Sequence, residues 1–186
     1  MLRPVIKECE GGYQLGITSE GLTVLHNSDF LITNGHRGLA YLEGLSLSPH
    51  LRYLEIATGM GPIPEYLVEK IRPFRKPVII DPINYALIAT LCARIKDRAG
   101  EISESAQEIV LRMQRRAILY SDPRFITHIP YPLQEAVQRH PELVGQFDVV
   151  MDFFGAIYYG RENRTQTVDL EKSLLSLTGS GIHCLQ

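Results

Sequence analysis

The chain has 186 residues, 45% of them apolar and 22% charged, a balance typical of one globular domain with a substantial core. A formal net charge of −2 gives no electrostatic support for nucleic-acid binding. No apolar run approaches the roughly 20 residues that span a bilayer. The three cysteines, Cys9, Cys92 and Cys184, form no paired motif, which favours a reducing cytoplasm and predicts no metal site.

Residues 1–49 are expected to form a small appendage packed on the main body. Two short β-type runs, 11–17 and 21–25, predict a hairpin. Ser28 or Asp29 can then cap a helix that reaches toward Leu45. We therefore divide the chain into an N-terminal appendage, 1–49, and a main domain, 50–186.

Strands and helices alternate through the main domain. Apolar runs predict strands at 52–57, 77–81, 117–120, 147–153 and 182–185, and the segments between them predict helices. Near-continuous apolar strands separated by helices favour a mainly parallel, doubly wound α/β sheet with helices on both faces. The ligand crevice of such a sheet lies at the carboxyl ends of its strands.

The most informative segment runs from Tyr53 to Pro62. It predicts a buried strand, then a turn containing Gly59 and Gly61 that opens a helix. Glycine lets a backbone approach a ligand closely, and a helix N-terminus leaves unpaired N–H groups, so the segment predicts a nucleotide-like cofactor. No Gly-Lys-Ser/Thr motif of a P-loop is present, and Pro62-Ile63-Pro64 stands where a nicotinamide-binding turn needs a third glycine.

Acidic residues recur at or just beyond the predicted strand ends: Glu55, Asp81, Asp122 and Asp152. Because parallel strands end at the same edge of a sheet, this pattern predicts one site there. The carboxylate of Asp81, with Pro82 after it, either accepts hydrogen bonds from a ribose diol or caps the next helix. The two roles are compatible.

The stretch from Glu55 to Gly61 resembles the acid-x-Gly-x-Gly-x-Gly signature of class I S-adenosylmethionine-dependent methyltransferases, with Ala57 in place of the first glycine. Segments 78–81, 121–123, 147–152 and 174–181 are similar, in order, to later motifs of that family. The resemblance covers about residues 50–186 and implies a Rossmann-like methyltransferase core with S-adenosylmethionine as cofactor. The contacts it implies come from Glu55, Ala57, Thr58, Gly59, Gly61, Asp81, Pro82, Asp122, Pro123 and Asp152.

Within that resemblance, Asp81 is expected to hold the ribose hydroxyls, Asp122 to meet the adenine amine, and Asp152 to lie beside the methionine part. The sequence departs from the family in a longer link near 100–116 and in stopping at Gln186, where a helix and two further strands usually follow. A shortened fold, a truncated chain, or a partner or second copy covering the sheet edge are the alternatives.

The sequence thus predicts a methyltransferase acting on an unidentified small-molecule or protein acceptor. No catalytic residue is assigned, because methyl transfer from a sulfonium mainly requires positioning. A catalytically silent binding module acting in a complex is the second hypothesis, and a nicotinamide-dependent oxidoreductase is the third.

Overall fold

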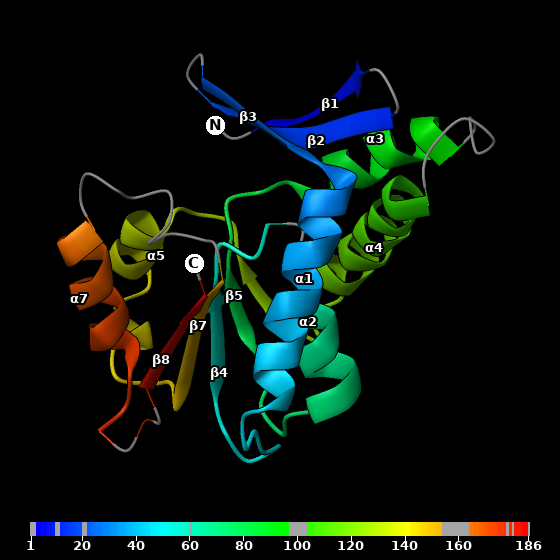
Figure 1. The fold of residues 1–186 in the computed structure, drawn as a ribbon. Helices are drawn as coiled ribbons and strands as arrows, with labels where there is room; N and C mark the ends of the chain where they lie inside the picture. The colour runs from blue at the N-terminus through cyan, green and yellow to red at the C-terminus, as the bar shows by residue number, and fades with distance from the viewer. Residues whose placement is uncertain are drawn as a thin grey trace.

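The computed structural model of the chain describes residues 3–9, 12–19, 22–59, 61–96, 104–153, 164–177, 179 and 181–185. These residues form a three-stranded sheet near the N-terminus and a five-stranded sheet flanked by helices (Figure 1). No helix within the described ranges is both long and apolar enough to cross a membrane.

The N-terminal sheet is antiparallel, with the order β1-β2-β3. Strands β2 (Gly12–Ser19) and β3 (Leu22–Asn27) pair as the predicted hairpin. Strand β1 (Arg3–Cys9), which sequence analysis missed, pairs with β2 on its other side. The predicted helix follows as α1 (Ser28–Glu43), and the small sheet lies beyond the carboxyl-terminal edge of the central sheet (Figure 1).

The central sheet is parallel throughout its described strands and has the order β6-β5-β4-β7-β8. Its strands are β4 (Tyr53–Ile56), β5 (Val78–Ile80), β6 (Thr127–Ile129), β7 (Val149–Phe153) and β8 (Gly181–Leu185). The chain moves outward from β4 to β6, then returns to β7 on the other side of β4. This reversal confirms a doubly wound, Rossmann-like α/β fold and puts the topological switch point between β4 and β7.

Helices cover both faces of the central sheet, with α1 to α4 on one face and α5 and α7 on the other (Figure 1). Their bounds are α2 (Ile63–Tyr66), which continues as a π-helical turn over Leu67–Ile71, α3 (Tyr85–Lys96), α4 (Glu104–Ser121), α5 (Leu133–Arg139), followed by a 3-10 turn over Pro141–Leu143, and α7 (Arg164–Leu174). Successive residues of β4 serve the two cores, since Tyr53 packs with Leu42 of α1 and Leu54 packs with Leu133 of α5. A strand repeat of two residues explains this alternation.

The predicted third strand at 117–120 is wrong. Those residues form the last turns of α4, and the third strand of the central sheet is β6. A four-residue apolar run fits a helix as well as a strand. Ile118 is 70% exposed, which suits a helix surface and not a strand covered on both faces. Strand β6 was not predicted because its three residues are too few to show a period.

This correction moves Asp122 and Pro123 to the opposite edge of the sheet from the predicted site. Both precede β6, and the Pro123 carbonyl accepts a hydrogen bond of 2.8 Å from Nζ of Lys76, which precedes β5. The Asp122 carboxylate pairs with the Arg124 guanidinium at 2.6 Å, which holds the pKa of Asp122 down at about 2. The predicted adenine contact at Asp122 therefore has no basis in the observed strand order.

The backbone at Ala57 supplies a test of the turn after β4. Ala57 has φ of 52°, in the left-handed region that costs a residue with a Cβ roughly 1–2 kcal/mol. We expect Ala57→Gly to raise the free energy of unfolding by up to about 1 kcal/mol, because glycine's unfolded-state entropy offsets only part of that strain. Ala40→Gly, on the exposed side of α1, should instead lower it by about 1 kcal/mol. Urea unfolding measures both, and equal losses in the two variants would contradict strain at Ala57.

Candidate functional site

The turn between β4 and α2 lies at the carboxyl-terminal edge of the sheet, beside the switch point. Ala57 and Gly59 both have left-handed φ values, 52° and 54°. The Ala57 N–H donates to the Ile80 carbonyl at 2.8 Å, and the Gly61 N–H donates to the Thr58 carbonyl at 3.0 Å. A Cβ added at Gly61 would lie 3.2 Å from that same Thr58 oxygen. The turn is therefore tightly closed, and Pro62 leads it directly into α2.

Asp81 joins the end of β5 to this turn. Its carboxyl is fully buried, with Oδ2 accepting from the Gly59 N–H at 3.0 Å and Oδ1 accepting from the Ile83 N–H at 2.9 Å. The Tyr85 hydroxyl lies 2.7 Å from both Asp81 Oδ2 and the Gly59 carbonyl. One phenolic proton thus faces two acceptors, and a proton on Asp81 would satisfy both. Burial raises the pKa of Asp81, although the hydrogen bonds from Tyr85 and the two backbone N–H groups oppose this shift.

The helix-capping role predicted for Asp81 belongs to another residue. The Asn84 side chain accepts a hydrogen bond of 3.1 Å from the Leu87 N–H and so caps α3. Asp81 instead closes a short turn through its bond to the Ile83 N–H. Pro82, between Asp81 and Ile83 in the sequence, is half-buried.

Helix α4 contributes a fully buried guanidinium, which lies beneath the turn, that is, on the side that faces α4. Arg116 donates from Nη1 to the Gly59 carbonyl at 2.8 Å and from Nη2 to the Gly61 carbonyl. It also forms a two-pronged ion pair with Glu65 of α2, at 3.0 Å from Nε and 2.6 Å from Nη2. The guanidinium thus holds two consecutive segments, the turn and the first helix after it.

Aromatic rings flank this guanidinium. Its central carbon lies 5.3 Å from the Tyr85 ring centre and 5.8 Å from the Tyr120 ring centre, within the range of cation–π attraction. The rings of Tyr120 and His128 are 4.6 Å apart, and His128 Nε2 lies 2.8 Å from the Asp81 carbonyl oxygen.

Three buried polar atoms near the turn form no well-defined hydrogen bond to a described residue: Glu55 Oε2, Thr58 Oγ1 and Tyr120 Oη, although the Thr58 hydroxyl lies close enough to the Glu55 carboxyl to lower its pKa. Burial raises the pKa of Glu55 well above its usual range, although the Arg116 charge opposes this shift. Such orphaned atoms are rare in folded proteins and mark places where a water or a ligand supplies the missing bond. Two of the three belong to the segment singled out from the sequence.

On the other face of the sheet, Asp152 at the end of β7 contacts Glu171 of α7. Both residues are buried, with 2% and 0% of their surfaces exposed. Burial, reinforced by the neighbouring Asp152 charge, raises the pKa of Glu171 to about 9. At neutral pH Glu171 is therefore protonated, so that a neutral carboxyl lies against Asp152 and α7 packs on the end of β7 without a second buried charge.

Among the predicted site residues, the structure brings one group together around the turn: Glu55, Ala57, Thr58, Gly59, Gly61, Asp81 and Pro82. Asp152 lies one strand away, across the switch point, while Asp122 and Pro123 lie at the opposite edge. Sequence analysis missed the partners that complete the network, which are Glu65, Tyr85, Arg116, Tyr120 and Glu171. Within the described part of the chain, no three His, Cys, Asp or Glu residues are grouped as a metal ion would require.

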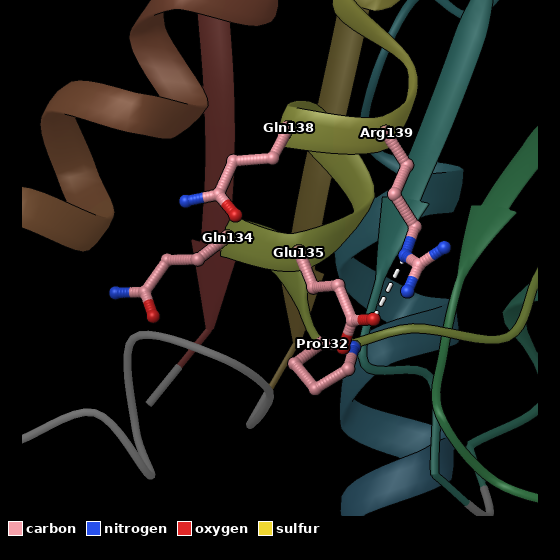
Figure 2. A pocket seen from close by; sticks show the side chains of 5 residues that line it. All are labelled: Pro132, Gln134, Glu135, Gln138 and Arg139. Atoms are coloured by element: carbon pink, nitrogen blue, oxygen red, sulfur yellow. Dashed lines mark hydrogen bonds and ion pairs between the residues drawn. The ribbon is translucent and has the colours of Figure 1, made fainter.

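A separate hollow lies along α5 (Figure 2). Gln134 and Gln138 extend to one side of it, while Glu135 and Arg139 form an ion pair of 2.8 Å on the other. Pro132 completes the lining, and four of these five residues are exposed. An open surface with no buried polar group is a poor ligand site, so the turn after β4 remains the better candidate.

No protein-family model and no curated protein matches the sequence. Among solved structures, the chain is similar to the crystal structure of the SAM-dependent methyltransferase from Agrobacterium tumefaciens, with 14% identity and a TM-score of 0.45. The alignment covers 96% of this chain and 51% of that one, so the chain spans about half the length of the solved protein. A likeness at this level says nothing of what the chain binds.

The Asp152–Glu171 pair predicts a specific dependence of stability on pH. Because the folded-state pKa of Glu171 lies above its unfolded value, the folded chain binds an extra proton between about pH 4.5 and pH 9, and stability falls as pH rises through that window. Glu171→Gln keeps a donor toward Asp152 at every pH. Between pH 5 and pH 8, we expect the free energy of unfolding of Glu171→Gln to rise relative to that of the natural chain by on the order of 1–3 kcal/mol.

Urea unfolding at several pH values measures this difference. Asp169→Asn provides a matched control, since Asp169 lies on the exposed side of the same helix. Parallel stability curves for the natural chain and Glu171→Gln would contradict protonation of Glu171.

Proposed function

We propose that the chain is an S-adenosylmethionine-dependent methyltransferase that acts on a small-molecule or protein acceptor. The observation that carries the proposal is the glycine turn after β4, which lies beside the switch point with left-handed backbone at Ala57 and Gly59. Open α/β sheets bind their ligands at this point. The turn also coincides with the segment whose sequence resembles the family signature.

The residues around the turn suit an adenosyl cofactor. Glu55 Oε2 and Thr58 Oγ1 are buried polar atoms whose hydrogen bonding is incomplete among the described residues, and the hydroxyl and ammonium groups of the cofactor would complete it. Bound S-adenosylmethionine would supply a methyl group already activated by its sulfonium. The task left to the chain is to bind, to orient and to exclude water, which needs no acid or base.

The contact proposed between Asp81 and the ribose requires a local rearrangement. Three donors already serve its carboxyl, and about one of its four acceptor positions remains. Because Asp81 is fully buried, a ribose diol reaches it only if a neighbouring group moves. The Tyr85 hydroxyl is the side-chain donor that now lies against it. The direct ribose contact is thus a proposal that includes a displacement of Tyr85.

The second candidate function is a silent binding module that keeps the fold and acts in a complex. What favours it is the same finding at Asp81, because a buried carboxyl that already holds the turn can persist without any cofactor. A partner or a second copy at an edge of the central sheet belongs to this alternative.

Calorimetric titration with S-adenosylmethionine, S-adenosylhomocysteine and NAD tests the proposal. Binding of the two adenosyl ligands, without binding of NAD, is the expected result. If the folded chain binds neither adenosyl ligand, the methyltransferase proposal is wrong. Formation of S-adenosylhomocysteine in the presence of candidate acceptors then separates an active enzyme from a silent module.

Substitution at Asp81 localises the site. Asp81→Asn turns one oxygen of the clamp into a donor that faces a backbone N–H. We expect it to weaken S-adenosylhomocysteine binding by about 1–3 kcal/mol, the scale of one lost buried hydrogen bond to a charged group. The matched control is Asp122→Asn, at the opposite edge of the sheet, which should leave the affinity unchanged. Unchanged binding by a folded Asp81→Asn variant would remove Asp81 from the site.

A further inference from the structure

The link between β5 and β6 contains a helix with a buried charge that the proposed chemistry does not use. Along α4, the residues Ile109, Met113, Arg116 and Tyr120 recur at helical spacing on one face. The first three are fully buried, so an arginine interrupts an otherwise apolar stripe. Burying a charge is costly unless it is paired and hydrogen-bonded, so this position calls for a specific explanation.

The contacts of Arg116 supply it. Four of its five N–H donors are used, two on Glu65 and one each on the Gly59 and Gly61 carbonyls. Because both carbonyls are fixed, the guanidinium restrains the backbone at Gly59 and at Gly61.

Only a guanidinium meets this geometry. Its planar fork reaches a carboxylate and two carbonyls at once, whereas an ammonium is a point charge with three donors on a flexible stem. The Tyr85 ring restricts the guanidinium further, at 5.3 Å, and the hydroxyl of the same tyrosine lies 2.7 Å from the Gly59 carbonyl. Gly59 is thus held from two directions by side chains of α3 and α4.

We propose that Arg116 is a positioning residue of the adenosyl site: from α4 it holds the Gly59 and Gly61 carbonyls beneath the turn, so that the opposite side of the turn is fixed for the ligand. The proposal rests on the function proposed above and deepens it. The link between β5 and β6, which contains α4, then contributes to the affinity for the cofactor. Since Arg116 lies beneath the turn, it acts through the backbone and touches neither the methyl donor nor the acceptor.

The test compares the affinity for S-adenosylhomocysteine, by calorimetry, in the natural chain and in variants whose folded fraction is checked by urea unfolding. Arg116→Lys keeps the charge and loses the fork. The double variant Arg116→Gln with Glu65→Gln removes both charges together, which avoids the destabilisation caused by a single unpaired buried charge. Arg115→Lys, at the neighbouring exposed position, is the matched control.

Both Arg116 variants, while fully folded, should bind S-adenosylhomocysteine roughly tenfold to a hundredfold more weakly, and Arg115→Lys should bind like the natural chain. A loss of stability alone cannot produce this result, because affinity falls only in proportion to the folded fraction. If either folded Arg116 variant binds S-adenosylhomocysteine with an affinity within about threefold of that of the natural chain, the inference about Arg116 is wrong, while the proposed function stands. Failure of the natural chain to bind overturns the proposed function, and the two failures are therefore distinguishable.

Discussion

A single buried guanidinium connects parts of the chain that lie more than fifty residues apart. Arg116 of α4 bonds to the turn after β4 and to Glu65 of α2. Its burial is sustainable only while all of these acceptors surround it, because an unpaired charge in this position would be strongly destabilising. The turn, α2 and α4 consequently form one cooperative unit at the edge of the sheet. The local shape of the candidate site is a consequence of that constraint.

The two faces of the sheet secure this edge by related means. On one face Asp81 ties the end of β5 to the turn, and on the other Glu171 ties α7 to Asp152 at the end of β7. Each fastening uses a carboxyl group whose pKa is raised by burial; at Glu171, where the pKa is about 9, a proton takes the place of a counter-charge. The switch point between β4 and β7 lies between the two fastenings. A ligand bound there would meet a preorganised backbone, which reduces the ordering cost of binding.

Much of the fold was predictable because strong local patterns agree with the tertiary structure. The apolar runs before Asp81 and at 147–153 are buried on both faces, and the turn after Glu55 lies where its glycines indicate. The third strand was not predictable, since the three residues of β6 are too few to show a period. The strand predicted at 117–120 also separated Arg116 from Tyr120, although both belong to α4. A helical repeat from Ile109 through Arg116 to Tyr120 is present in the sequence, but only the packing shows that an arginine on this stripe is buried and what it contacts.

The most direct measurement is a crystal structure of the chain with S-adenosylhomocysteine. We expect the adenosyl ligand to lie against the turn at Ala57, Gly59 and Gly61, with the guanidinium of Arg116 still bonded to the Gly59 and Gly61 carbonyls and the Glu55 carboxyl hydrogen-bonded to the ligand. A ligand bound elsewhere, or a turn released from Arg116 when the ligand binds, would contradict this account.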